Sequence, residues 1–130
     1  MNRFMANGHF SFRKRICSFR YAFNGIRLLL GNEHNAWVHF FAAICVIMAG
    51  FFFRLSAVEW SVILLTIGLV FAMEAVNTAI EKIADMISPE YNETIKQIKD
   101  LAAGAVLFVA IAAAITGLLI FAPKVISFLQ

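Results

Sequence analysis

The sequence predicts an all-α membrane protein in which an N-terminal amphipathic surface helix precedes three transmembrane helices. The composition is 62% apolar and only 15% charged, and the mean hydropathy is +0.81. A soluble domain is usually about half apolar and about a quarter charged, so this chain has too few polar side chains to cover a globule. Its length of 130 residues suits one domain, and we expect residues 1–130 to form a single membrane domain.

Basic residues gather ahead of the first apolar segment, and no Asp or Glu precedes Glu33. These basic residues are Arg3, Arg13, Lys14, Arg15, Arg20 and Arg27. Basic segments beside a membrane span usually lie on the cytoplasmic side, in contact with anionic lipid headgroups. The net charge of +3 therefore indicates a membrane surface, and we expect no nucleic-acid partner.

The segment 11–30 is predicted to be the amphipathic surface helix. Apolar side chains recur there at steps of three and four residues, at Phe12, Ile16, Phe19, Phe23, Ile26 and Leu30. The basic side chains fall largely elsewhere on the helical wheel. A basic helix with an aromatic face typically lies in the membrane interface. Gly31 and Asn32 are expected to end this helix.

Three apolar segments follow, and each is long enough to cross a bilayer. The predicted spans are 36–53, 58–85 and 98–121. Three spans place the two termini on opposite sides of the membrane, and the basic N-terminus is expected to be cytoplasmic. Small residues in the third span, at 102–105 and 112–114, predict close helix packing within the chain or between subunits.

The ends of the spans carry local signals. Trp60 is expected to anchor the second span at the outer interface, directly after a tight turn at 54–56. Pro89 is expected to end the second span, because the residue before a proline avoids the helical region. A polar loop at 90–95 follows, and Pro123 is expected to close the third span.

Polar side chains follow one face of the second span. They are Glu74, Asn77, Thr78, Glu81 and Asp85, which fall within about 100° of one another on a helix. If Trp60 marks the outer interface, Glu74 lies about 21 Å deeper, inside a hydrocarbon core about 30 Å thick. A carboxylate there costs at least about 2.5 kcal/mol, so such residues usually mark a functional site. The alternative for Asn77 and Thr78 is a hydrogen bond between helices.

Further charged residues are expected at the cytoplasmic ends of these helices, where Glu33 precedes the first span and Lys99 and Asp100 begin the third. Carboxylates suit Mg²⁺, and lysine suits phosphate groups. Glu74 could take a proton from a hydroxyl presented from within the lipid. Together these residues predict phosphoryl transfer to a lipid alcohol. Taken alone, Lys99 and Asp100 would also fit a solvated helix end.

Two stretches carry a family resemblance. The run Glu-Ala-Val-Asn-Thr-Ala-Ile-Glu from Glu74 to Glu81 is followed by Asp85, and then by Lys99 and Asp100 ahead of Leu-Ala-Ala-Gly-Ala-Val. This pattern resembles the bacterial integral-membrane diacylglycerol kinase and undecaprenol kinase family, from about residue 12 to the end of the third span. The resemblance implies a homotrimeric lipid kinase of the bacterial inner membrane that uses ATP and Mg²⁺, with active sites shared between subunits.

The resemblance also implies roles for individual residues. Glu74 corresponds to the catalytic base, and Glu33 and Glu81 correspond to metal-binding glutamates. The nucleotide-binding positions are matched by Lys14, Tyr21, Asn77, Glu90, Tyr91, Lys99 and Asp100. Lys14 replaces an arginine of the best-known diacylglycerol kinases, a change that keeps the charge but loses the planar guanidinium.

His39 bears on the identity of the lipid substrate. It stands where the best-known diacylglycerol kinases have an acidic residue, and the spacing of Glu33, Asn35 and His39 is more like that of the undecaprenol kinases. The resemblance therefore favours undecaprenol over diacylglycerol, with His39 and Glu74 beside the lipid hydroxyl. The alternative for His39 is an interfacial histidine that is hydrogen-bonded to the backbone.

Two other functions fit parts of the sequence. A proton- or ion-conducting oligomer would use Glu74 as an intramembrane relay, but it would have no need of the charged residues gathered at one membrane face. A non-catalytic interaction subunit would need none of these groups. Binding of Mg·ATP and transfer of phosphate to a lipid would separate the kinase from both alternatives.

Overall fold

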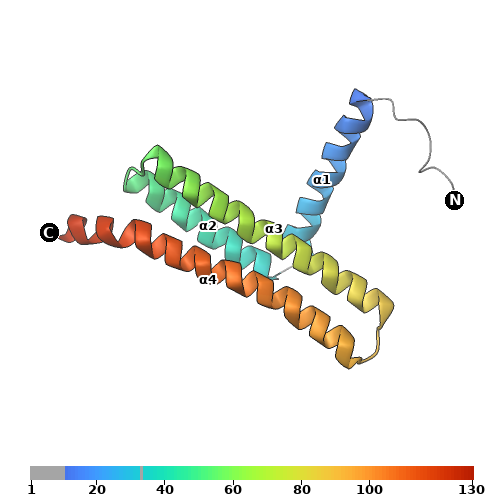
Figure 1. Ribbon diagram of the computed structural model, residues 1–130. Helices are drawn as coiled ribbons and strands as arrows, with labels where there is room; N and C mark the ends of the chain where they lie inside the picture. Colours follow the sequence, from blue (N-terminus) through green and yellow to red (C-terminus); the bar gives the residue numbers. More distant parts are fainter. Residues whose placement is uncertain (1–10, 33) are drawn as a thin grey trace.

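The computed structural model describes residues 11–32 and 34–130, and this part of the chain forms four helices (Figure 1). They are α1 (Phe12–Asn32), α2 (His34–Phe52), α3 (Ala57–Ile87) and α4 (Glu93–Leu129). Three of them, α2, α3 and α4, are long and apolar enough to cross a membrane. The predicted all-helical fold with three spans is therefore confirmed.

α1 projects away from the bundle formed by the other three helices (Figure 1). α1 ends at Asn32, within the Gly31–Asn32 pair that was expected to end it. Gly31 lies in the last turn of α1, and no described glycine has a positive φ. Residue 33 lies outside the described residues.

The turn between α2 and α3 is tight, as predicted, and local hydrogen bonds hold it. Arg54 adopts a left-handed conformation with φ of 52°. Ser56 then caps α3 reciprocally with Glu59: the Ser56 N–H donates to Glu59 Oε2 at 2.7 Å, and the Glu59 N–H donates to Ser56 Oγ at 3.3 Å. This capping box satisfies two donors at the start of α3 that have no partner within the helix.

The loop between α3 and α4 is shorter than expected. α3 ends at Ile87, ahead of Pro89, as predicted. α4 already begins at Glu93, because the Asn92 side chain accepts hydrogen bonds from the N–H groups of Thr94 and Ile95. The predicted loop at 90–95 therefore ends at the N-cap Asn92, and the first turn of α4 lies outside the apolar segment.

Pro123 lies inside α4, so the expectation that it closes the third span was wrong. Proline is tolerated in membrane helices where surrounding groups compensate for the lost hydrogen bond. Contacts beyond it hold the continued helix: Lys124 Nζ lies 2.9 Å from Glu59 Oε1, and the rings of Phe52 and Phe128 are 5.6 Å apart.

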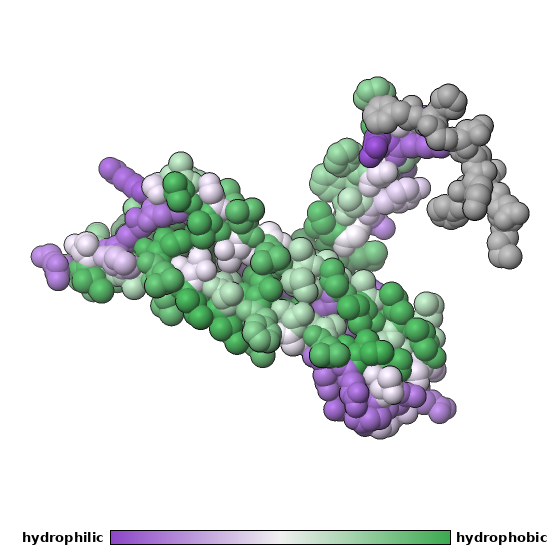
Figure 2. Space-filling model, in the orientation of Figure 1, coloured by the Kyte–Doolittle hydropathy of each residue, from purple (hydrophilic) through white to green (hydrophobic). Residues whose placement is uncertain are grey.

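The surface of the bundle is dominated by apolar side chains. Large side chains such as Leu65, Leu101 and Phe108 are exposed. Hydrophilic residues gather at the two ends of the bundle, with a mainly hydrophobic belt between them (Figure 2). This distribution matches a bilayer with water on both sides.

The end of the α2–α3 hairpin next to its turn is closely packed around Gly50. A Cβ atom added at Gly50 would lie 2.7 Å from Trp60 Cη2 and 2.9 Å from Trp60 Cζ2. The rings of Trp60 and Phe51 are 4.9 Å apart. Gly50 therefore allows α2 and α3 to approach closely at this end of the hairpin.

We expect Gly50→Ala to lower the free energy of unfolding by about 1–3 kcal/mol, because the added methyl group forces the Trp60 ring to shift. Gly68→Ala is the matched control, since a Cβ at Gly68 meets nothing within 4 Å. Thermal unfolding in detergent micelles measures both. Equal midpoints for the two variants would contradict the close contact at Gly50.

Candidate functional site

One face of α3 points into the bundle and carries buried polar residues. Glu74 is only 2% exposed, and Asn77 and Thr78 are each 8% exposed. The apolar residues Ile63 and Val70 are buried on the same helix. Since Glu74 lies eleven residues after Ile63 and four after Val70, the helical period places all three on one face. The predicted polar stripe therefore faces inward at Glu74, Asn77 and Thr78, whereas Asp85 at its end is exposed.

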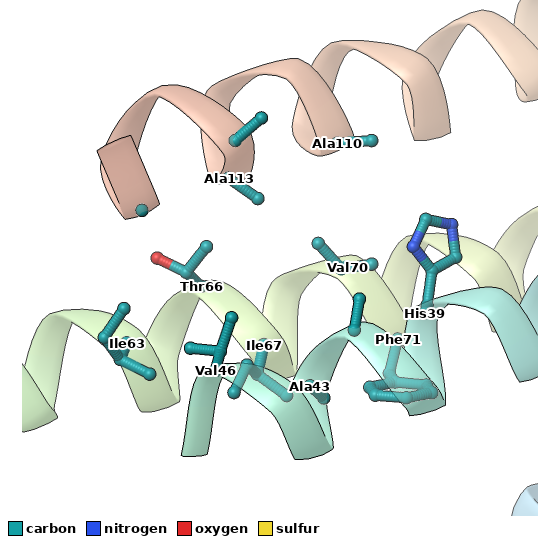
Figure 3. A pocket seen from close by; sticks show the side chains of 13 residues that line it. His39, Ala43, Val46, Ile63, Thr66, Ile67, Val70, Phe71, Ala110 and Ala113 are labelled. Carbon is teal, nitrogen blue, oxygen red and sulfur yellow. The ribbon is translucent and has the colours of Figure 1, made fainter. Parts of the chain in front are cut away.

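Glu74 has a partner from the neighbouring helix α2. His39 Nε2 lies 2.9 Å from Glu74 Oε1, and the Glu74 side chain is 3% exposed. The His39 ring extends from α2 toward the space below α4 (Figure 3). A histidine nitrogen this close to a buried carboxylate stabilises it and restricts its orientation. The structure thus gives His39 a carboxylate partner, in place of the backbone partner that was the alternative.

Asn77 and Thr78 have unused hydrogen-bonding atoms. Asn77 Nδ2 donates to Glu81 Oε1 at 3.0 Å along α3. In the described part of the chain, Asn77 Oδ1 and Thr78 Oγ1 are buried without a hydrogen-bond partner. Leaving a buried polar atom unpaired costs about 1–3 kcal/mol. The alternative interpretation was that Asn77 and Thr78 form hydrogen bonds between helices. Within the described residues, Asn77 Oδ1 and Thr78 Oγ1 form no such bond.

Glu81 supplies a carboxylate, the type of ligand that Mg²⁺ prefers. Asn77 presents its Nδ2 group to this carboxylate, and not its carbonyl oxygen. Glu33, the second expected metal ligand, lies outside the described residues. Within residues 11–32 and 34–130, no group of three or more His, Cys, Asp and Glu side chains is arranged to hold a metal.

Charged groups from α3 and α4 meet at the end of the bundle opposite Trp60. Lys99 Nζ lies 2.8 Å from Asp85 Oδ1, and Lys96 Nζ lies 3.2 Å from Asp100 Oδ2. Sequence reasoning missed Asp85 as the partner of Lys99, although Asp85 belongs to the predicted stripe. The two lysines are thereby held beside two carboxylates, and each ammonium still has hydrogen atoms to donate to an anion.

A recess of about 350 Å³ lies among these charges and the loop between α3 and α4. Glu90, Tyr91, Lys99 and Asp100 all line it, so the structure brings four of the predicted nucleotide-binding residues together. Tyr91 donates a hydrogen bond to Glu93, and this bond raises the pKa of the Tyr91 hydroxyl because a phenolate could not donate it.

Three predicted nucleotide-binding residues do not line this recess. Asn77 is buried on α3. Lys14 and Tyr21 are exposed on α1, and Tyr21 retains 74% of its accessible surface. Their helix projects from the bundle (Figure 1), so within one chain they do not join the recess at the α3–α4 loop.

A cavity of about 280 Å³ lies between α2, α3 and α4 (Figure 3). His39 lines one part of it, and apolar residues of all three helices line the rest, including Val46, Val70 and Ala113. Sequence reasoning missed this cavity. The small residues at 112–114 predicted close packing, but Ala113 and Ala114 border open space instead.

The arrangement can serve proton transfer next to a membrane-embedded hydroxyl. A buried carboxylate on a candidate membrane span, in contact with a histidine that lines an apolar cavity, is suited to accept a proton from an alcohol that cannot leave the lipid. The charged recess at the α3–α4 loop is suited to anionic phosphate groups. Both parts include residues of α3.

Comparisons with known proteins agree with this geometry. Residues 20–121 match the family described as prokaryotic diacylglycerol kinase. An undecaprenol kinase of Bacillus subtilis is 44% identical over 107 residues, which cover 82% of this chain and 87% of the relative. A diacylglycerol kinase of Synechocystis is 39% identical over 86% of this chain and 65% of the relative. The diacylglycerol kinase of Escherichia coli is 30% identical over 86% of this chain and 92% of the relative.

The matched region includes α2, α3 and most of α4, together with the turn and loop that join them. It therefore contains His39, Glu74, Glu81 and the charged recess. The chain belongs to the prokaryotic diacylglycerol kinase family.

Proposed function

We propose that this chain transfers the γ-phosphoryl group of ATP to the hydroxyl of a membrane lipid alcohol, with Mg²⁺ as the metal cofactor. The family and its relatives indicate a lipid kinase that acts on undecaprenol or diacylglycerol. The observation that carries the proposal is the buried Glu74 carboxylate, paired with His39 beside an apolar cavity. Membership of a kinase family gives no support to the ion-conducting alternative.

Glu74 is the general base in this proposal. It accepts the proton of the lipid hydroxyl as that oxygen attacks the γ-phosphorus, and the bond to the β,γ-bridging oxygen breaks. The released product is ADP. His39 positions the carboxylate and also lies near the lipid hydroxyl. Since phosphoryl transfer needs mostly alignment and charge stabilisation, the fixed Glu74 orientation accounts for part of the rate.

The nucleotide would be bound at the charged end of the bundle. We assign Asn77, Glu90, Tyr91, Lys99 and Asp100 to this site, because the last four line the recess at the α3–α4 loop and Asn77 lies on α3, where it donates to Glu81. Lys99 is suited to the phosphate groups, while Asp85 holds its ammonium group in place. Glu33 and Glu81 would hold Mg²⁺, which offsets phosphate charge when bound.

Lys14 and Tyr21 would reach a nucleotide only if α1 of one subunit lies against the recess of another. We propose a homotrimer of this kind in the bacterial inner membrane, with α1 lying in the cytoplasmic interface. The aromatic and basic side chains of α1 support the interfacial position. The charged recess and the basic α1 would then lie together on the cytoplasmic side.

Among the two lipids, we propose undecaprenol as the preferred substrate. His39 supports this preference, because it stands where the best-known diacylglycerol kinases have an acidic residue. At this position the chain would present an imidazole, and not a carboxylate, to the lipid hydroxyl. The Bacillus subtilis undecaprenol kinase is also more similar to this chain than the two diacylglycerol kinases compared above.

Replacing the proposed base tests the mechanism directly. We expect Glu74→Gln to reduce kcat by about 10²–10⁴-fold, because a neutral amide cannot accept the proton. ATP binding, measured with a fluorescent analogue, should be unchanged because Glu74 lies away from the charged recess. Turnover near the wild-type rate, followed by label transfer from ATP to lipid, would rule out Glu74 as the base.

His39 should act through the position of Glu74. We expect His39→Leu to lower kcat by roughly tenfold or more while the KM for ATP stays unchanged, because the carboxylate loses its polar contact with the imidazole. His39→Gln, which retains a donor, should recover part of the loss. Equal kcat values for the two variants would contradict this positioning role.

The metal assignment predicts a shifted magnesium requirement. We expect Glu81→Gln to raise the Mg²⁺ concentration for half-maximal turnover by roughly tenfold or more, because a carboxylate ligand is lost. Glu59→Gln is the control, since Glu59 lies at the opposite end of α3 beside Lys124. A magnesium titration of lipid phosphorylation measures both, and an unchanged midpoint for Glu81→Gln would refute the assignment.

A further inference from the structure

We infer that the cavity between α2, α3 and α4 holds the part of a polyprenyl chain nearest its hydroxyl group, so that the enzyme selects a single-chain polyprenol. This inference rests on the proposed phosphorylation of a lipid alcohol at Glu74. It adds a chain-binding site and a chemical reason for discrimination between the two lipid classes.

The position of the cavity suits a lipid whose hydroxyl group reaches Glu74. Glu74 does not itself line the cavity, but His39, whose Nε2 lies 2.9 Å from Glu74 Oε1, lines it together with Val70 and Phe71. Ile63 also lines it, about 10 Å further along α3 toward the outer surface. In the proposed membrane orientation, the direction from His39 to Ile63 runs from the cytoplasmic side toward the bilayer centre. The chain of a lipid in the cytoplasmic leaflet runs in the same direction, away from its polar end.

The size of the cavity matches a short length of one chain. An apolar protein cavity of about 150 Å³ holds one benzene molecule, which has six carbon atoms. A cavity of about 280 Å³ therefore accommodates roughly ten carbon atoms, or about two five-carbon isoprene units. The remainder of a long polyprenyl chain would lie outside, in the surrounding lipid.

The chemistry of the lining favours a chain without polar atoms. Only two lining residues, His39 and Thr66, carry polar side-chain atoms. His39 Nε2 is engaged with Glu74, and the Thr66 hydroxyl donates to the Val62 carbonyl oxygen at 2.7 Å. Diacylglycerol has ester groups close to its hydroxyl, and their carbonyl oxygens would lose water without gaining adequate partners here. A polyprenol has no polar atom beyond its hydroxyl group.

α4 contributes small side chains that leave this space open. Ala110, Ala113, Ala114 and Gly117 line the cavity from α4. A Cβ atom added at Gly117 would meet nothing within 4 Å. Larger side chains can therefore be introduced at Gly117 to fill the cavity without a backbone clash.

The first experiment compares Gly117→Leu with the matched control Gly68→Leu. Gly68 is also a helical glycine with open space around its Cβ, but it does not line the cavity. We expect Gly117→Leu to raise the KM for a ten-carbon or longer prenol about tenfold, with the KM for ATP unchanged. The same KM for prenol in both variants would overturn the inference.

Lipid preference in the wild-type protein provides a second criterion. In mixed micelles at equal mole fraction, we expect a kcat/KM for the prenol at least tenfold above that for diacylglycerol. A higher kcat/KM for diacylglycerol would contradict the argument from ester groups. Absence of phosphorylation of either lipid would instead refute the proposed function.

A photocrosslinking experiment tests the site without needing turnover or an altered fold. A prenol with a diazirine in its second isoprene unit is bound to the wild-type protein, irradiated, and the adducts are mapped by mass spectrometry. We expect adducts at Val46, Ile67 and Ala113, which line the cavity. Adducts confined to Leu107 and Phe108, on the exposed side of α4, would overturn the inference.

Discussion

The close contact between His39 and Glu74 is the one on which the organisation of the site depends. It joins α2 to α3, with 2.9 Å between His39 Nε2 and Glu74 Oε1, and an isolated carboxylate would be costly in lipid. His39 also lines the apolar cavity, so this contact links the buried carboxylate to that space. In the proposed reaction, Glu74 serves the lipid hydroxyl, and the charged recess at the α3–α4 loop serves the phosphate donor.

The spans and the inward face of α3 could be predicted from the sequence, because they follow from apolar length and helical period. Glu74, Asn77 and Thr78 are all buried on the side that their spacing indicated. The turn at Arg54 and the end of α3 before Pro89 also follow from local rules. These features depend on short stretches of chain and need no knowledge of how the helices cross.

The pairing of His39 with Glu74 and of Lys99 with Asp85 could not be predicted in this way. Each pair joins residues on different helices, and its distance depends on how the helices cross and on their relative height. The cavity depends on the same geometry, since Ala113 would equally suit close helix packing. The early start of α4 had a usable signal in Asn92 followed by Glu93, a common arrangement at helix starts.

The ion pairs at the two ends of α3 and α4 have a consequence for the relative register of these helices. On α3, Glu59 and Asp85 are separated by about 39 Å of helix, and on α4 their partners Lys124 and Lys99 are separated by about 38 Å. The separation of the two carboxylates on α3 therefore matches the separation of the two lysines on α4. Both ion pairs form together at only one relative position of the two helices along their axes. A slip of one helical turn, about 5.4 Å, would break both pairs and could bring the bulky Phe121 to the level of Gly117. The register of α4 is thus coupled to the volume of the cavity between α2, α3 and α4, although each ion pair alone contributes little stability.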